Sequence, residues 1–267
     1  MIEEQSRTID RYSSGALSHD IPSESHRLQL LEEQLDPVTT AVLADRWLPD
    51  SPRCLELGAG AGSMARWMAE RHPSGHVTAI DIDARYLDAG WAPNLDVRED
   101  DVCALDFPAG SFDLIHARTL FMHLPEREDM VARAATWLAP NGWLVLEDVA
   151  TFPCDSSPCP EWRKVMKAVA CLLERQGSDL DWARQRQSAV FADAGLADLG
   201  MSVEVFTVGD GGPAERFWRA FLDQVRPALS GQGLLTAGEL DTALALFDEP
   251  GFLDTAEAMI SVWGRRS

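Results

Sequence analysis

Short apolar runs, separated by glycines, prolines and charged residues, recur along the first 150 residues of the chain. They predict strands at residues 54–57, 76–81, 95–102 and 111–118, and residues 138–148 are interpreted as a helix end, a Pro-Asn-Gly turn and a fifth strand. Five strand-and-helix steps in register predict an α/β fold in which helices cover a mostly parallel sheet.

Helical patterns dominate the residues before the first strand. Residues 24–35 predict one helix, and Asp36-Pro37 supplies an N-cap and a first-turn proline for a second helix that ends near Trp47. Apolar residues follow one helical face through both segments, so most of this region is expected to pack. Gln34 and Tyr12 are the candidate ligand contacts.

The chain after residue 150 alternates between helical and extended patterns. Predicted helices cover residues 162–173, 214–229 and 236–247, and predicted strands cover residues 201–208 and 258–263. Thr236 and Glu239 have the spacing of a capping box. Helical insertions at these points are expected to overhang the carboxyl ends of the strands.

The segment from Cys54 to Met64 is the most specific signal, because a strand, a glycine-rich turn and a helix start follow one another. Its alternating glycines are Gly58, Gly60 and Gly62. Glycines let the backbone pass close to a ligand, and a helix start offers free N–H groups. The alternative is a glycine-rich turn that binds nothing.

The spacing of this turn separates two cofactors. A dinucleotide fingerprint needs its third glycine where this chain has Ser63. Glu56, two residues before the first glycine, would repel a pyrophosphate but attract a cationic ligand. The turn therefore favours S-adenosylmethionine over NAD and leaves an NAD oxidoreductase as the weakest alternative.

The segment resembles motif I of the class I S-adenosylmethionine-dependent methyltransferases, and the whole pattern is similar to small-molecule methyltransferases of bacterial secondary metabolism. The resemblance implies a Rossmann-like, doubly wound, seven-stranded sheet, mostly parallel with an antiparallel last strand, plus helical lid and cap insertions. It also implies that the glycine loop cradles the methionine end of the cofactor and that Glu56 helps hold its amino group.

The expected domain organisation has three parts. Residues 1–50 form an N-terminal helical lid, residues 51–150 form the S-adenosylmethionine-binding core, and residues 151–267 complete the core. The last part also carries the helical substrate cap, at about 153–195 and 212–248.

Asp81 ends the second predicted strand roughly twenty residues after the glycine loop, which is the position of the acidic ribose ligand in nucleoside-binding α/β folds. Ile82 follows it and is placed to pack on an adenine face. The alternative for Asp81 is an N-cap of a helix predicted from Ala84 to Gly90, a role that Asp83 fits better.

The resemblance assigns two further contacts to the third strand. Asp101 and Val102 match the residues that contact the adenine amino group. Asp100 is an alternative that differs by one position in register, and a solvated acidic loop is the alternative without a ligand.

At the end of the fourth strand, the resemblance assigns Ala117 and Arg118 to the methionine moiety of the cofactor. Arg118 departs from the small polar residue that is commoner in the family. Its alternative is a salt bridge to Glu56 or another nearby acid, which would hold the site together without touching the ligand.

A sulfonium is already a strong electrophile, so the protein needs mainly to hold the acceptor in line at ~3–3.5 Å and to exclude water. An oxygen acceptor also benefits from a base. His123 is the first candidate because it lies in the loop after the fourth strand, and its alternative is a structural role. His116, Glu147 and Asp148 are further candidates, with a structural role favoured for His116 and a place on the polar rim of the pocket as the alternative for the two acids.

The charge of the chain narrows its partners. It carries 43 acidic against 23 basic residues, a formal net charge of −20, which would repel nucleic acid and anionic membranes. No run approaches ~18 apolar residues, and the start Met1-Ile2-Glu3-Glu4 lacks the basic and apolar regions of a signal peptide, so a cytoplasmic protein is expected.

Cysteine and tryptophan contents add two expectations. Five cysteines without a C-x-x-C pair support neither a disulfide framework nor a metal site. Three of the nine tryptophans, Trp162, Trp182 and Trp218, fall in the predicted cap, where they would line a pocket for a large apolar substrate or pack the cap onto the core.

We therefore expect a methyltransferase that moves a methyl group from S-adenosylmethionine to an O or N atom of a small, apolar or aromatic metabolite and releases S-adenosylhomocysteine. The alternative from another class is a cyclase or pericyclic catalyst that keeps the cofactor site and transfers no methyl group. The sequence leaves the acceptor, its regiochemistry and a homodimer open.

Overall fold

The computed structural model describes residues 15–267, which form two compact units. The sheet unit comprises residues 36–149, 181–204 and 259–267. The helical unit comprises, of the described residues, 15–35, 150–180 and 205–258. Tyr12, one of the two candidate ligand contacts near the N-terminus, lies outside the described residues.

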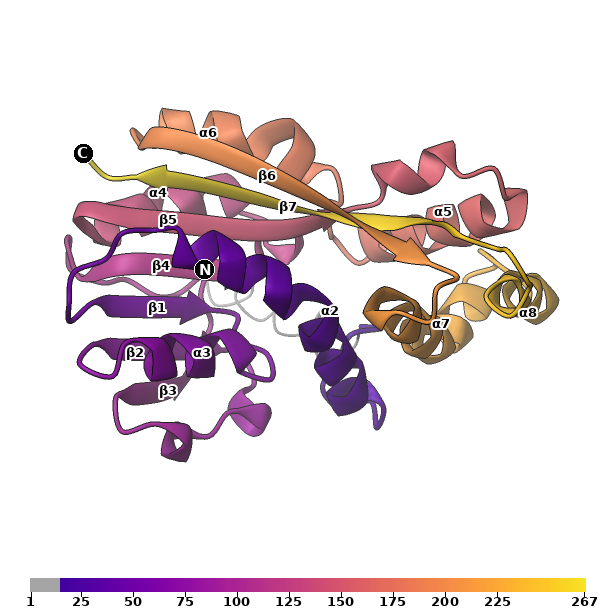
Figure 1. The fold of residues 1–267 in the computed structure, drawn as a ribbon, viewed down its shortest axis with the longest axis horizontal. Helices are drawn as coiled ribbons and strands as arrows, with labels where there is room; N and C mark the ends of the chain where they lie inside the picture. The colour runs from indigo at the N-terminus through magenta and orange to yellow at the C-terminus, as the bar shows by residue number, and fades with distance from the viewer. Residues whose placement is uncertain (1–14) are drawn as a thin grey trace. The chain divides into compact units, whose positions relative to one another are not determined.

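Seven strands form one sheet in the order β3-β2-β1-β4-β5-β7-β6. Their bounds are β1 Arg53–Leu57, β2 His76–Asp81, β3 Leu95–Glu99, β4 Phe112–Arg118, β5 Leu138–Ala150, β6 Ala197–Val208 and β7 Asp254–Arg265. The pairs β1–β2, β1–β4, β2–β3 and β4–β5 are parallel, and Figure 1 shows the yellow arrow of β7 pointing against that of β6. The predicted doubly wound, seven-stranded, mostly parallel sheet with an antiparallel last strand is confirmed.

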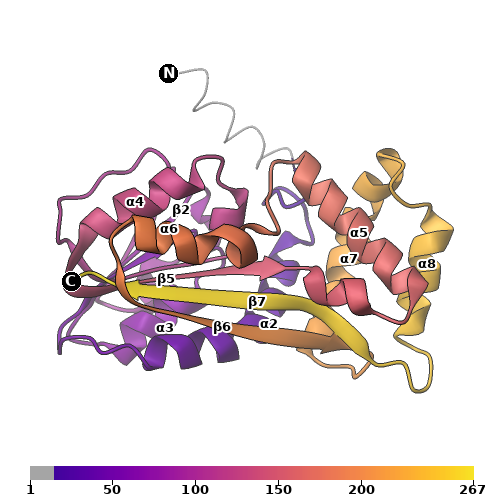
Figure 2. The same ribbon diagram turned by 90° about the horizontal axis from the view of Figure 1, so that it is seen from above.

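Within the described residues, seven α-helices precede or connect these strands. Their bounds are α2 Glu24–Ala44, α3 Ser63–Arg71, α4 Arg127–Trp137, α5 Pro160–Arg175, α6 Ser188–Asp193, α7 Pro213–Gly231 and α8 Ala237–Leu246. In the sheet unit, α4 and α6 cover one face of the sheet and α3 covers the other (Figure 2). In the helical unit, α5, α7 and α8 pack against one another (Figure 2).

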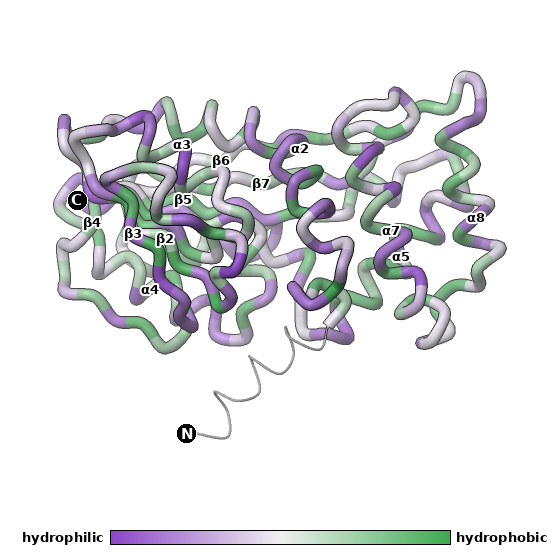
Figure 3. Tube along the Cα trace, turned by 90° about the horizontal axis from the view of Figure 1, so that it is seen from below, coloured by the Kyte–Doolittle hydropathy of each residue, from purple (hydrophilic) through white to green (hydrophobic). Residues whose placement is uncertain are grey.

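The central strands are buried because their sequences are apolar on both sides. In β1, β2 and β4 nearly every residue is inaccessible to solvent, as expected for parallel strands that have helices on both faces. Figure 3 shows β2 and β5 as apolar segments of the trace. The edge strand β3 is exposed along most of its length, and its sequence is correspondingly polar.

The prediction of two helices before residue 50 is wrong. A single helix, α2, runs through the Asp36-Pro37 pair without a break. Pro37 has no N–H, so the carbonyl one turn earlier in the helix lacks its usual donor. Pro37 is exposed, and water can reach that carbonyl instead. The side chain of Asp36 does not cap a helix but accepts hydrogen bonds from Ser63 and Arg118.

Four further boundaries differ from the predictions. The helix end and the Pro-Asn-Gly turn expected before the fifth strand belong to β5 itself, which begins at Leu138. The third strand ends at Glu99 and not at residue 102, and the helix predicted from Ala84 consists of two 3-10 turns whose N-caps are Asp83 and Asp88. The sixth strand begins at Ala197 and not at residue 201. Within it, Gly200 packs against the indole of Trp263, where a Cβ would come within 2.3 Å of Nε1. The capping box at Thr236 and Glu239 is confirmed.

Candidate functional site

The glycine turn lies between β1 and α3 and has the backbone that the sequence predicted. Gly58, Gly60 and Gly62 all have positive φ angles, of 67°, 57° and 90°. A side chain at Gly62 would also collide with neighbours, because its Cβ would lie 2.4 Å from the Trp91 ring. Glycine is therefore required here by both the backbone conformation and the available space.

Asp81, at the end of β2, is joined directly to this turn. Its carboxylate accepts hydrogen bonds from the backbone N–H of Gly60 at 2.8 Å and of Asp83 at 3.0 Å. Asp83 caps the following 3-10 turn, as predicted, so Asp81 is left to face the glycine loop. Ile82 is half-buried beside it.

The acidic segment after β3 lies next to the end of β2. The N–H of Asp100 donates to the carbonyl of Asp81 at 2.9 Å. Asp101 accepts a hydrogen bond from the N–H of Cys103 at 2.8 Å, and the side chain of Val102 is buried. The structure thus brings the predicted ribose and adenine residues to one edge of the sheet.

Arg118, at the end of β4, is paired with an acid of α2. Its guanidinium lies 2.8 Å from Asp36 Oδ1 and donates to Thr39 Oγ1 at 3.0 Å and to Ser63 Oγ at 3.3 Å. The neighbouring Ala117 is buried. The acid that Arg118 pairs with is Asp36, not Glu56.

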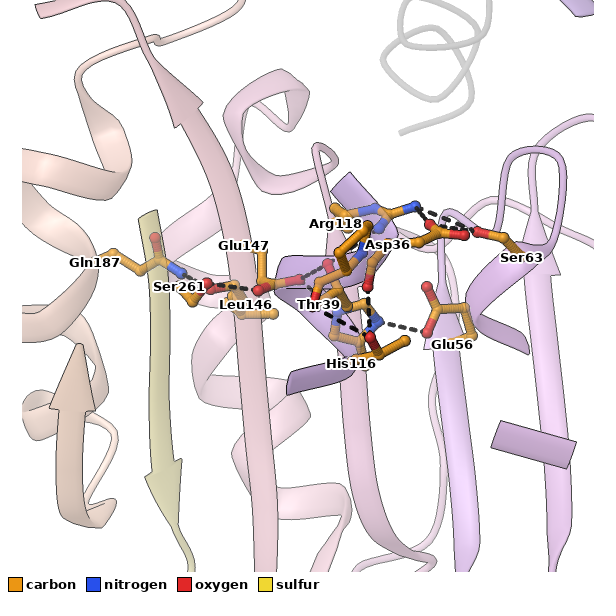
Figure 4. Close-up of polar contacts among 12 residues, drawn as sticks. Asp36, Thr39, Glu56, Ser63, His116, Arg118, Leu146, Glu147, Gln187 and Ser261 are labelled. Carbon is orange, nitrogen blue, oxygen red and sulfur yellow. Dashed lines mark hydrogen bonds and ion pairs between the residues drawn. The ribbon is translucent and has the colours of Figure 1, made fainter. Parts of the chain in front are cut away.

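Beneath this ion pair lies a buried histidine of β4. It joins two carboxylates from the strands on either side of β4 (Figure 4). His116 Nδ1 lies 2.6 Å from Glu56 Oε2 on β1, and its Nε2 lies 3.2 Å from Glu147 Oε2 on β5. Thr39 and Ser261 each donate to Glu147 at 2.5 Å. We call Glu56, His116 and Glu147 the buried triad.

The electrostatics of the buried triad favour a charged imidazole. Burial alone would lower the pKa of His116, but the two carboxylates outweigh it and raise that pKa to about 9. For Glu147, burial raises the pKa, but the hydrogen bonds and the charge of His116, together with the two hydroxyls, bring it below its usual range. The triad thus places an imidazolium between the side chains of Glu56 and Glu147.

The other candidate bases have different surroundings. His123 ends the short turn Phe121–His123 after β4 and is half-buried, so it is accessible in part. Asp148 is buried on β5, and burial raises its pKa to about 8 against the opposing effects of the Met122 backbone and Arg127. The rim position considered for Glu147 and Asp148 is wrong, because both side chains lie in the interior.

With this geometry in view, comparison with known proteins assigns the family. A family profile described as a methyltransferase domain matches residues 26–197, well over half of the chain. The chain belongs to this methyltransferase family. The resemblance to class I S-adenosylmethionine-dependent methyltransferases is confirmed.

Individual relatives of the methyltransferase are similar over part of their length. Methyltransferase str2 of Strobilurus tenacellus is 39% identical over 103 residues, which cover 36% of this chain and 35% of that protein. The chain spans between 30% and 41% of the length of the first three curated relatives that it matches.

Solved structures share the fold. The YcgJ protein of Bacillus subtilis has a TM-score of 0.57 and 18% identity, over 87% of this chain and 99% of that one. A coclaurine N-methyltransferase bound to N-methylheliamine and S-adenosylhomocysteine has a TM-score of 0.55 and 14% identity, over 100% of this chain and 87% of that one. At these identities the similarity supports the architecture alone.

The tryptophans of the predicted cap are packing residues in the methyltransferase. In the helical unit, Trp162 is buried against Trp218 and Phe247, with ring centroids 5.7 and 5.3 Å apart, and its indole donates to the Thr255 carbonyl at 2.9 Å. Trp182 is buried in the sheet unit. Gln34, a candidate ligand contact, is buried too and donates to Glu257.

Three residues that complete the buried network carried no functional signal in the sequence. Asp36 and Thr39 are three residues apart, so their common helical face was the available clue, but the adjacent proline made Asp36 look like an N-cap. Ser261 stands in an apolar strand, where nothing marks its partner Glu147.

In residues 15–267 no group of three His, Cys, Asp or Glu side chains is arranged to hold a metal ion. Over the same range, every helix is too short or too polar to cross a membrane.

Proposed function

We propose that this methyltransferase binds S-adenosylmethionine on the glycine turn and transfers its methyl group to an O or N atom of a small, apolar or aromatic metabolite. The observation that carries the proposal is the union of three left-handed glycines with the Asp81 carboxylate, which bonds the Gly60 N–H at 2.8 Å. The excess of acidic residues supports a small-molecule acceptor over nucleic acid.

Each end of the cofactor then has a candidate partner. Asp81 would accept hydrogen bonds from the ribose hydroxyls while Ile82 packs on the adenine, and Asp101 and Val102 would contact the adenine amino group. At the other end, Glu56 would hold the ammonium group, and Ala117 and Arg118 would border the methionine moiety. Carboxylates suit these tasks because they accept from two hydroxyls or pair with an ammonium.

The cofactor supplies an electrophilic methyl group, and the protein supplies position. Holding the acceptor atom in line with the methyl carbon lowers the entropic barrier, and excluding water strengthens the local electrostatics. An acceptor hydroxyl must lose its proton during transfer. His123, half-buried in the loop after β4, is the candidate that accepts it.

Calorimetric titration of cofactor-free protein with S-adenosylmethionine, S-adenosylhomocysteine and NADH tests the proposal. We expect both sulfur nucleosides to bind and NADH to leave no signal. Asp81→Asn should weaken binding about tenfold or more, because it removes a charged acceptor for the ribose. Asp96→Asn, at an exposed carboxylate on β3, is the matched control and should bind like the native protein.

Binding of NADH alone would overturn the proposal. An unchanged affinity in Asp81→Asn would remove that residue from the ribose role. Product mass then separates methyl transfer from cyclisation, because a methyl group replacing a hydrogen adds about 14 mass units, whereas cyclisation adds none.

A further inference from the structure

We infer that His116 is a positioning residue that holds the Glu56 carboxylate in one orientation as the receptor for the ammonium group of S-adenosylmethionine. This inference rests on the proposed function. It assigns a role to a histidine that touches neither cofactor nor substrate and that acts through its neighbour.

The first support is the geometry of Glu56. Only one of its carboxylate oxygens is engaged, by His116 Nδ1 at 2.6 Å. Within the described part of the chain, the second oxygen has no hydrogen-bond partner. Figure 4 shows this oxygen pointing away from His116, on the side of Asp36 and Ser63. Glu56 stands two residues before Gly58, on the strand that leads into the glycine turn.

The second support is the way His116 itself is held. Its other nitrogen contacts Glu147, which also accepts hydrogen bonds from Thr39 on α2 and Ser261 on β7. Glu147 is therefore fixed from three sides and has no freedom to leave the imidazole. A ring held at both nitrogens fixes the carboxylate on its far side, as an outer partner orients a ligand in other sites.

The third support is the charge that remains. The Arg118 guanidinium and the Asp36 carboxylate cancel each other above the triad. Within the triad, one imidazole lies between two carboxylates, so the acids outnumber the base. An ammonium beside Glu56 would neutralise the cluster, which makes a cationic ligand end the complementary one.

Loss of the imidazole would release Glu56. Glu147 keeps two hydroxyl donors, whereas Glu56 keeps no donor from the triad, so its carboxylate is no longer held in one orientation. A carboxylate that is free to turn binds an ammonium less tightly, because it must be ordered on binding.

The experiment compares two ligands that differ in the methionine end. S-adenosylhomocysteine carries the amino acid group, and 5′-methylthioadenosine lacks it. By calorimetry, His116→Gln should weaken S-adenosylhomocysteine binding about tenfold or more, while methylthioadenosine binding changes by less than about twofold. His76→Gln, at a half-exposed histidine on β2, is the control and should change neither.

A second variant keeps the test decisive if His116→Gln folds poorly. Glu147→Gln leaves His116 and Glu56 as a neutral pair, so it should also lower the affinity for S-adenosylhomocysteine selectively. A double variant of His116→Gln with Glu56→Gln should lose little more than either change alone, because both act on one interaction.

The outcomes separate the two proposals. If the native protein binds neither nucleoside, the proposed function fails. If the native protein binds both and the two triad variants weaken them equally, or weaken neither, the cofactor assignment stands and the positioning role of His116 is overturned.

Discussion

Glu147 in the sheet unit and Glu257 in the helical unit are both buried carboxylates, and both accept hydrogen bonds from neighbouring side chains. Glu147 accepts from His116, Thr39 and Ser261. Glu257 accepts from the amide of Gln34 and the indole of Trp218. The first set of donors includes a cation, and the second consists of neutral groups.

This difference shifts the pKa values of the two carboxylates in opposite directions. Burial raises the pKa of both acids, but the imidazolium and two hydroxyls reverse the effect at Glu147, whereas the two neutral donors do not reverse it at Glu257. Burial alone therefore does not fix the direction of the shift, because the charge of the donors also enters.

The largest effect is expected from removing the cation of the buried triad. His116→Leu would leave two buried carboxylates unpaired, so the free energy of unfolding should fall by about 3–5 kcal/mol. Urea denaturation at pH 7, followed by tryptophan fluorescence, measures it. A loss below about 1 kcal/mol would show that the carboxylates find other partners.

The pH dependence of stability should report the same cation. The pKa of His116 rises from ~6.5 in an unfolded chain to about 9 in the fold. Its stabilisation is therefore complete below pH ~6.5 and is lost as pH rises through about 9, a change of up to roughly 3 kcal/mol. Denaturation curves of the native protein and His116→Gln should converge over this window. Curves that stay parallel would contradict the assignment.

Removing one hydroxyl donor to Glu147 should have an intermediate effect. Ser261→Ala deletes a hydrogen bond to an ionised carboxylate, which is worth roughly 1.5–3 kcal/mol. Ser111→Ala, which removes a surface hydroxyl bonded to the Pro108 carbonyl, is the matched control. Thermal unfolding of both variants side by side measures the difference, and equal shifts would sink the idea that charge strengthens the Ser261 bond.

The smallest effect is expected at Glu257, whose two hydrogen-bond donors are neutral. Glu257→Gln keeps an acceptor for Gln34 and removes a carboxyl that is already disfavoured as an ion, so stability at neutral pH should change by less than about 1 kcal/mol. Because the folded pKa of Glu257 is raised, the native protein loses stability as pH rises above the usual glutamate range, and the variant should be spared this loss. A large destabilisation by Glu257→Gln would show that the two carboxylates are alike.

The features of the site that could be predicted from the sequence are those that depend on neighbouring residues in the chain. Gly58, Gly60 and Gly62 indicate a turn because only glycine adopts such φ angles freely. Asp81 ends an apolar run whose predicted bounds match those of β2. The N-cap at Asp83 and the capping box at Thr236 also depend on neighbours within a few residues. Such features can be identified from the order of residues alone.

The sequence by itself determined the alternation of strands and helices, the glycine turn and the acid at the end of β2, because each depends on backbone conformation and apolar periodicity over short stretches. Tertiary structure alone decided that Asp36 pairs with Arg118, that Ser261 meets Glu147 and that Gly200 lies beneath Trp263. These contacts join residues that are 63 to 114 positions apart in the chain, and a buried charge finds its partner only when strands from distant parts of the chain lie side by side.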